Sequence, residues 1–462
     1  MGSKWKTSFL TDHYIISSGL SKPAKDFGTG YPFLSFKDVF YNYFLPDSLT
    51  QLVQSTDKER VTCSVKRGDI FLTRTSETMH ELGMSSVALK DYEDATFNGF
   101  CKRLRPKEES ELEPEYVGYY LRSPSFRQNM LAFSTMSTRA SLNNEMISRL
   151  EISYPGRKIQ KKIAHVLLSF DKKIAISKAI NQTLEQMSQT LFKSWFVDFD
   201  PVIDNALDAG HSIPEALQSR AELRQKVRNS ADFKPLPADI RALFPAEFEE
   251  MELGWVPKGW MLESVAKSIN INPSVKLPQN TIAKYVDMKS LPTQGYSISD
   301  VIEKPYAGGA KFQKNDTLFA RITPCLENGK TGFVDFLDEQ ETAFGSTEFI
   351  VMRGTTKVHY SYVACLAREN NFRLHAIQNM VGSSGRQRVQ NSCFDSFYIA
   401  IPTPSVMSLF AGKVSSYFDK MYCCNVENKS LTTLRDTLLP KLISGELSLE
   451  DLPDLVTQTE PA

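Results

Sequence analysis

An internal repeat with one constant offset limits the possible folds of this chain more than any other feature. The segment Lys66–Thr75 (KRGDIFLTRT) matches Gln313–Ile322 (QKNDTLFARI), and both Asp69 and Arg74 find identical residues 247 positions further along. The matched pairs at this offset are Asp69 and Asp316, Arg74 and Arg321, Phe97 and Phe344, Arg139 and Arg386, Ile152 and Ile399, and Pro155 and Pro402. An offset held over this length indicates duplication, so we expect two modules with the same fold.

Each copy begins with short β-prone runs separated by glycine, proline and asparagine, and it ends in one long amphipathic helix. The apolar residues of the first helix recur at spacings of three and four: Ile163, Leu167, Phe170, Ile174, then Ile180, Leu184, Met187, Leu191. The second helix repeats the spacing with Phe410, Val414, Tyr417 and Met421, then Leu431, Leu434 and Leu438. One such stripe is typical of a helix packed on its own domain, whereas two matched stripes favour pairing of the helices. We therefore predict an α+β fold with two duplicated globular domains, joined by two long helices that form an antiparallel coiled coil.

These patterns divide the chain into six segments. We expect a first globular module at 1–155, the first long helix at 156–197, a connector at 198–254, a second module at 255–402, the second long helix at 403–447 and a tail at 448–462. The connector carries twelve acidic residues against six basic ones, which separates it from the basic first helix.

Composition indicates an ordinary globular protein without a membrane span. Hydrophobic residues make up 41% of the chain, and no apolar run reaches the length of a bilayer-spanning helix. The N-terminus lacks the apolar core of a secretory signal, and the seven cysteines form no C-x-x-C pair. A reducing, cytoplasmic setting is the expectation.

Two windows at matching places in the copies, 116–144 and 370–394, contain no acidic residue. Their polar side chains include Arg122, Arg127 and Arg139 in the first window, and Arg373, Arg386, Gln387 and Arg388 in the second. A further basic set accompanies the repeated strand: Lys66, Arg67, Arg74, Lys311, Lys314 and Arg321. Acid-free surfaces do not repel phosphates, and arginine and glutamine make bidentate contacts to base edges. A solvated polar loop is the alternative, but recurrence in both copies favours DNA contact, while Asp69 and Asp316 are expected to cap a turn.

Sequence motifs of catalysis are incomplete. The chain has no Asn/Asp-Pro-Pro-aromatic motif for holding a flipped adenine, since Asn272-Pro273 is followed by Ser274. The string PCLENGKTG has Pro324 where a phosphate-binding loop needs its first glycine, and the six histidines form no H-x-x-x-H pair. We expect no catalytic residue, no metal ligand and no cofactor.

The strings LFKSWFVDFDPV (Leu191–Val202) and LLPKLISGEL (Leu438–Leu447), which close the two helices, carry a family resemblance. With the duplicated plan, they resemble the specificity subunit of type I restriction-modification systems over essentially the whole chain. The resemblance implies a non-catalytic subunit whose two domains each read one half of a bipartite site in double-stranded DNA. It also implies helices that set the spacing and dock two methylation subunits, which transfer methyl groups from S-adenosylmethionine to adenine, and restriction subunits in the full complex.

Four aromatic residues share one helical face at the end of the first helix: Phe192, Trp195, Phe196 and Phe199. They are candidates for a hydrophobic anchor that binds a methylation subunit. The alternative is packing against the second helix and the connector. Two other functions also stay open at this point, a single-chain restriction-methylation enzyme and a coiled-coil scaffold that does not bind DNA.

Overall fold

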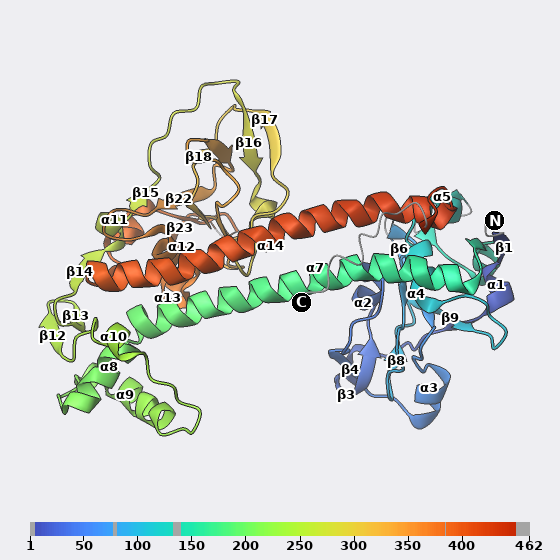
Figure 1. Cartoon of the computed structure of the whole chain (residues 1–462), viewed down its shortest axis with the longest axis horizontal. Coiled ribbons are helices and arrows are strands. Elements are labelled where there is room, and N and C mark those ends of the chain that lie inside the picture. Colours follow the sequence, from blue (N-terminus) through green and yellow to red (C-terminus); the bar gives the residue numbers. More distant parts are fainter. Residues whose placement is uncertain (1–4, 77–80, 133–139, 384, 450–462) are drawn as a thin grey trace. The chain divides into compact units, whose positions relative to one another are not determined.

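The computed structural model describes residues 5–76, 81–132, 140–383 and 385–449 (Figure 1). Its internal contacts divide the chain into two compact units. Unit 1 consists of Met1–Ala175 with Asn428–Ala462, and unit 2 consists of Ile176–Glu427. Each unit holds one of the two repeated modules together with part of each long helix.

The module of unit 1 contains two main sheets. The first has the order β2 (Tyr14–Ser18), β9 (Cys101–Pro106), β5 (Ile70–Thr73) and β7 (Ser85–Val87), all antiparallel. The second places β3 (Phe27–Leu34) between β4 (Gln51–Val53) and β8 (Thr96–Phe97), with β3 and β8 parallel. Two short pairs, β1 (Lys6–Phe9) with β11 (Glu151–Tyr154) and β6 (Thr75–Ser76) with β10 (Ala140–Ser141), complete the strands. The helices are α1 (Leu10–His13), α2 (Phe36–Tyr41), α3 (Asp57–Thr62), α4 (Pro114–Tyr120), α5 (Pro124–Ala132) and α6 (Asn144–Ser148).

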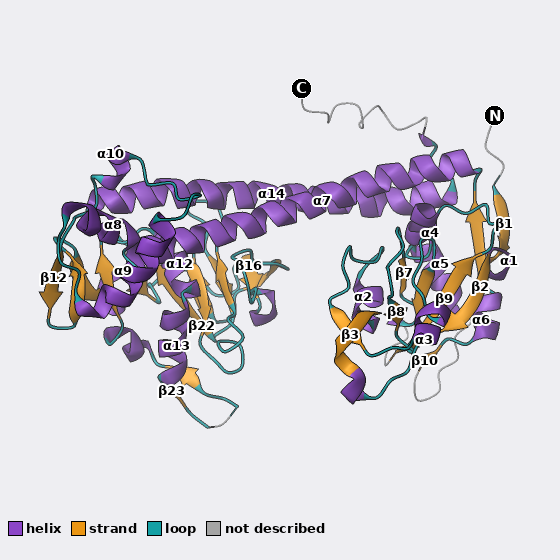
Figure 2. Cartoon of the chain, turned by 90° about the horizontal axis from the view of Figure 1, so that it is seen from below, coloured by secondary structure: helices purple, strands orange, loops and turns teal. Residues whose placement is uncertain are grey.

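The module of unit 2 repeats this plan (Figure 2). Its first sheet has the order β15 (Asn270–Ile271), β22 (Phe349–Arg353), β19 (Thr317–Ala320) and β20 (Thr331–Phe333). Its second has the order β17 (Ile302–Pro305), β16 (Ile282–Val286), β21 (Ala343–Gly345) and β18 (Ala310–Phe312), and β16 and β21 are again parallel. The remaining elements are β14 (Met261–Ser264) paired with β25 (Tyr398–Ile401), β23 (Met380–Val381) paired with β24 (Arg388–Val389), α11 (Val265–Ser268), α12 (Tyr360–Arg368) and α13 (Asn370–Gln378). The matching strand orders agree with the duplication seen in the sequence.

A buried aspartate–arginine pair occupies the same place in both modules. Asp69 precedes β5 and accepts from Arg105 of β9 at 2.6 Å, and Asp316 precedes β19 and accepts from Arg353 of β22 at 2.6 Å. Each aspartate also accepts a backbone N–H from the residue three positions earlier, so the prediction that Asp69 and Asp316 cap a turn is confirmed. Both carboxylates are fully buried. Burying either charge without its arginine partner would destabilise the fold.

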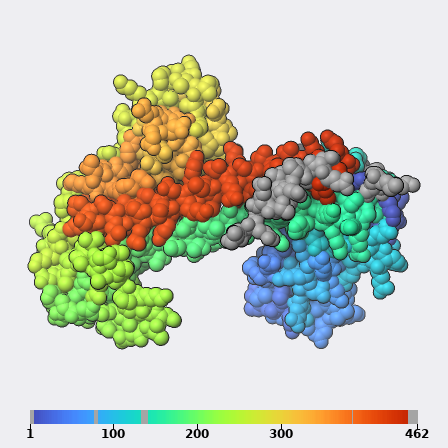
Figure 3. All heavy atoms as spheres, in the orientation of Figure 1, coloured from blue at the N-terminus to red at the C-terminus, as the bar shows by residue number. Residues whose placement is uncertain are grey.

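The two long helices are α7 (Arg157–Phe192) and α14 (Pro404–Ser444), and α7 continues through a π-helical turn at Lys193–Val197. In unit 1, Ile163 and Leu167 of α7 share a core with Leu442 of α14. In unit 2, the start of α14 packs against the second module, where red atoms lie beside orange ones in Figure 3.

The contacts within unit 2 fix the direction of the two helices. Asn181 of α7 donates to Asn425 of α14 at 2.7 Å, and further along α7 the ring of Phe192 meets that of Phe410. Residue numbers rise on one helix as they fall on the other, so the segments are antiparallel. The predicted α+β class with two modules and antiparallel helices is confirmed.

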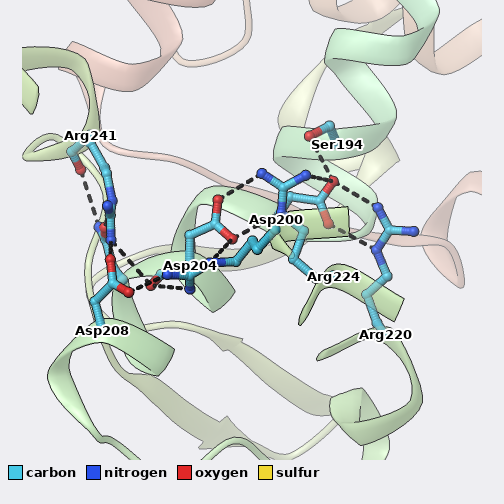
Figure 4. A network of polar contacts seen from close by, with 9 residues as sticks. Ser194, Asp200, Asp204, Asp208, Arg220, Arg224 and Arg241 are labelled. Atoms are coloured by element: carbon cyan, nitrogen blue, oxygen red, sulfur yellow. Dashed lines mark hydrogen bonds and ion pairs between the residues drawn. The ribbon is translucent and has the colours of Figure 1, made fainter. Parts of the chain in front are cut away.

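The connector folds into a charged helical hairpin, followed by α10 (Ala238–Arg241) and a pair of strands, β12 (Phe248–Met251) and β13 (Gly254–Pro257). Aspartates at every fourth position of α8 (Asp200–Ala209) face arginines at every fourth position of α9 (Glu215–Arg228), as Figure 4 shows. The pairs are Asp200 with Arg220 at 2.7 Å, Asp204 with Arg224 at 2.7 Å, and Asp208 with Arg228. Much of the acidic charge of this segment is therefore neutralised internally rather than presented to solvent.

Candidate nucleic-acid interface

Arg74 and Arg321 follow the equivalent strands β5 and β19, so the predicted correspondence holds in space. Arg74 is exposed, and its backbone N–H donates to the carbonyl of Phe100 at 2.9 Å. Arg321 is half-buried, and its Nη2 donates to the carbonyl of Val389 at 2.8 Å. Because rigid strands carry both residues, each module can present an arginine at a defined position.

The second acid-free window forms a β-hairpin, β23 with β24, that projects from α13 in Figure 2. Arg386 near its tip is exposed, whereas Arg388 on β24 donates three hydrogen bonds of 2.7–3.0 Å to the carboxylate of Glu348. The backbone N–H of Gln387 donates to Thr323 at 3.1 Å, which ties the hairpin to the module. Arg386 is thus the arginine of this window that is best placed for an outside partner.

Arg122 and Arg127 hold the fold of the first module, contrary to their expected contact with DNA. The guanidinium of Arg122 donates to the carbonyls of Ser85, Val39, Phe40 and Asn42, and burial lowers its pKa to about 10. Arg127 donates to the carbonyl of Leu82 at 2.6 Å, and burial lowers its pKa too. A buried cation destabilises the fold unless hydrogen-bond acceptors surround it, and backbone carbonyls supply those acceptors here.

The remaining basic residues expected to contact DNA differ in their exposure and in whether a carboxylate already pairs with them. Lys66 is exposed, Lys311 is half-buried, and Arg373 is half-buried with a bond to Asn370 at 3.2 Å. Arg67 pairs with Glu115 at 2.7 Å, and Lys314 pairs with Glu339 at 2.8 Å. Arg139 lies outside the described residues.

The four aromatic residues predicted to bind a methylation subunit are buried in unit 2. Phe192, Trp195, Phe196 and Phe199 are between 1% and 8% exposed. Their rings contact Tyr362 of the second module, Phe410 of α14, and Phe244 and Phe248 of the connector. The structure therefore has the alternative, packing against the second helix and the connector, and these four side chains present little aromatic surface to another subunit.

Three arginines with clear structural roles escaped the sequence reasoning. Arg105 and Arg353 pair with the two buried aspartates, and Arg368 donates to four backbone carbonyls as Arg122 does. A one-residue change in the repeat offset, from 247 to 248, places Arg105 on Arg353 and could have revealed that pair.

Neither a metal site nor a membrane span emerges from the part of the chain that the structure describes. No group of three or more His, Cys, Asp or Glu side chains in these segments is arranged to hold a metal ion. None of the described helices is both long and apolar enough to cross a bilayer.

Comparison with known proteins identifies relatives over nearly the whole length of the chain. Residues 2–186 match the family model described as the type I restriction modification DNA specificity domain. The HindI specificity subunit of Haemophilus influenzae is 25% identical, with 96% of this chain and 100% of the relative aligned. The MjaIX specificity subunit of Methanocaldococcus jannaschii is also 25% identical, with 97% and 94% aligned.

The fold has a solved counterpart as well. The S subunit of a type I restriction-modification system from M. genitalium superposes with a TM-score of 0.52 over 95% of this chain and 96% of that one, at 12% identity. Over nearly its whole length the chain is thus similar to specificity subunits of type I restriction-modification systems.

Proposed function

We propose that this chain is the DNA sequence-specificity subunit of a type I restriction-modification complex, with no catalytic role of its own. The observation that carries the proposal is the alignment of two specificity subunits with 96% and 97% of this chain. The duplicated modules support it, because each offers an arginine directly after the equivalent strand, Arg74 after β5 and Arg321 after β19. Two equivalent modules suit a recognition site with two parts.

We further propose that each module reads one half of a bipartite site in double-stranded DNA. In the second module the proposed reading elements are the hairpin with Arg386 and Gln387 and the neighbouring Arg321, and in the first module Arg74 is proposed to contact the DNA. Arginine makes bidentate bonds to guanine, and glutamine makes them to adenine. The segments proposed as recognition modules are 1–155 and 255–402.

The long helices are proposed to set the distance between the half-sites and to dock methylation subunits, which carry out adenine methylation. Restriction subunits are proposed to join this core. Inserting about four residues, one helical turn, into both helices should lengthen the unread gap without changing either half-site. A change in the half-sites at constant gap length would contradict the spacing role.

The proposed function is tested by mapping methylated adenines in cells that produce this chain with its methylation subunits. Methylation confined to one bipartite sequence, and lost when the chain is omitted, is the expected result. Methylation of the same sequence without the chain would overturn the proposal. Purified chain alone should transfer no methyl group, which separates the proposal from a single-chain restriction-methylation enzyme.

A further inference from the structure

Three residues of unit 1 share one face at the end of the β5–β9 ladder. Lys102 of β9 lies opposite Leu72 of β5, and just beyond the end of β5 the backbone N–H of Arg74 donates to the carbonyl of Phe100. Because side chains directly opposite one another point to the same side and alternate along each strand, Arg74, Phe100 and Lys102 project from the same face. Phe100 is 62% exposed.

Lys102 is a buried cation without an acidic partner. It is 9% exposed, and its Nζ donates to the hydroxyl of Ser18 at 2.9 Å. Among the described residues, no acidic group contributes to the pKa of the Lys102 ammonium, and neither Lys102 nor the Arg74 guanidinium forms an ion pair with a carboxylate. Burial lowers the pKa of Lys102, and the positive charge of Arg74 lowers it further. A cation in this setting destabilises the fold unless an anion comes to it.

The second module shows that the fold does not require a cation at this position. Lys102 stands three residues before Arg105, and in the equivalent strand Ile350 stands three residues before Arg353. Ile350 is fully buried and fills the place of the lysine with apolar atoms. Lys102 is therefore an addition specific to the first module.

The position two residues before Lys102 also differs between the modules, and there it is the second module that carries the charged residue. Glu348, five residues before Arg353, places a carboxylate beside Arg321 and Arg388, where its pKa is lowered by Arg388 first and also by Arg321. The first module has Phe100 there instead. The arginine of the second module thus has a built-in anion nearby, whereas Arg74 and Lys102 share a face with an exposed aromatic ring.

We propose that Arg74 and Lys102 together bind a phosphate of the DNA backbone, with the Phe100 ring packing against the adjoining nucleotide. The site rests on the proposed function and deepens it, because it assigns the first module a positioning contact that the second module lacks. Two cations without a carboxylate match a phosphodiester, and contacts to phosphates fix the register of a protein on DNA without reading its sequence.

The test replaces Lys102 with the residue of the second module, K102I, in the full chain. Binding to a labelled duplex of arbitrary sequence is measured over a range of salt concentrations, and the melting temperature is measured without DNA. The expected variant binds roughly five- to tenfold more weakly at low salt, with the slope of log affinity against log salt reduced by about one. Its melting temperature should rise, because an unpaired buried cation is removed.

R103V, which introduces the second module's residue at the next position of β9, is the matched control. Arg103 points to the opposite face and donates to the carbonyl of Ser64 at 2.6 Å, so the salt slope should not change. R74Q, at an exposed position, should also reduce the slope of log affinity against log salt by about one. This variant replaces K102I as the test if K102I fails to fold.

The outcomes separate the two claims. A wild-type chain that binds no DNA removes the proposed function itself. A wild-type chain that binds, with unchanged affinity and slope in K102I or in R74Q, overturns the phosphate site alone. A lower melting temperature in K102I with an unchanged slope would make Lys102 a structural residue.

Discussion

Arg435 of α14 donates to the carboxylate of Asp171 of α7 at 2.6 Å inside unit 1, and Tyr119 of the module donates to the second oxygen of the same carboxylate. One aspartate thus joins both long helices to the first module. Burial alone would lower the pKa of Arg435, but the hydrogen bonds that Arg435 donates to Asp171 and Asp436 outweigh this effect and raise the pKa above its usual value.

Replacing Arg435 with methionine should therefore destabilise unit 1. The side chains of Arg435 and Asp171 are only 15% and 25% exposed, so R435M should lower the free energy of unfolding by about 1–3 kcal/mol in urea titrations. E145Q breaks the exposed pair between Glu145 and Arg149 and should cost less than about 1 kcal/mol. Equal effects of the two variants would mean that the helix junction does not depend on this contact.

Trp195→Ala tests the aromatic core of unit 2. Removing a nearly fully buried tryptophan should cost about 3–5 kcal/mol, because its contacts with Phe244 and Phe410 are lost and a cavity remains. Circular dichroism during thermal unfolding gives the measurement. A variant of wild-type stability that fails only to assemble with a methylation subunit would restore the docking role.

Arg224→Met tests the charged hairpin of the connector. The Asp204 carboxylate would lose its bidentate partner while staying buried, so a loss of about 3–5 kcal/mol is expected. Because the loss falls on α8 and α9, limited proteolysis should cut the connector faster while the modules persist. K226M on the exposed side of α9 is the control and should leave the cleavage rate unchanged.

Asp335 predicts a pH dependence of stability in unit 2. Burial raises its pKa to about 6 from the ordinary value of 3.8. A carboxyl group with a raised pKa in the folded state adds stability that is fully present below about pH 4 and is lost as the pH rises through about 6. Asp335→Asn should therefore melt at a higher temperature than wild type at pH 7 and lack this pH dependence. Parallel melting curves of the two proteins between pH 4 and 7 would show that the carboxyl is not desolvated.

Much of the fold could be predicted because it follows from repetition and periodicity. The constant offset predicted both modules. The apolar spacing predicted the two long helices, which begin at Arg157 and Pro404 in the structure. Asp69 and Asp316 were correctly expected at turns, because an aspartate beside a strand often accepts nearby backbone N–H groups.

Which arginines are bonded within the protein and which are exposed could not be predicted, because this depends on which chain segments meet in space. Arg122 and Arg386 come from equally acid-free windows, yet Arg122 reaches four carbonyls while Arg386 is exposed. The stripe around Trp195 carried the same ambiguity, since a core and a docking surface have the same periodicity in sequence.

The most direct test of half-site reading by separate modules is the mapping of methylated adenines in cells that produce Arg386→Ala with the methylation subunits. Arg386 is exposed on the second module, so the variant should relax base preference in one half of the bipartite sequence, with about 1–3 kcal/mol of discrimination lost. The other half and the gap should stay as in wild type. Relaxation of both halves together, or a methylation pattern identical to wild type, would contradict the assignment.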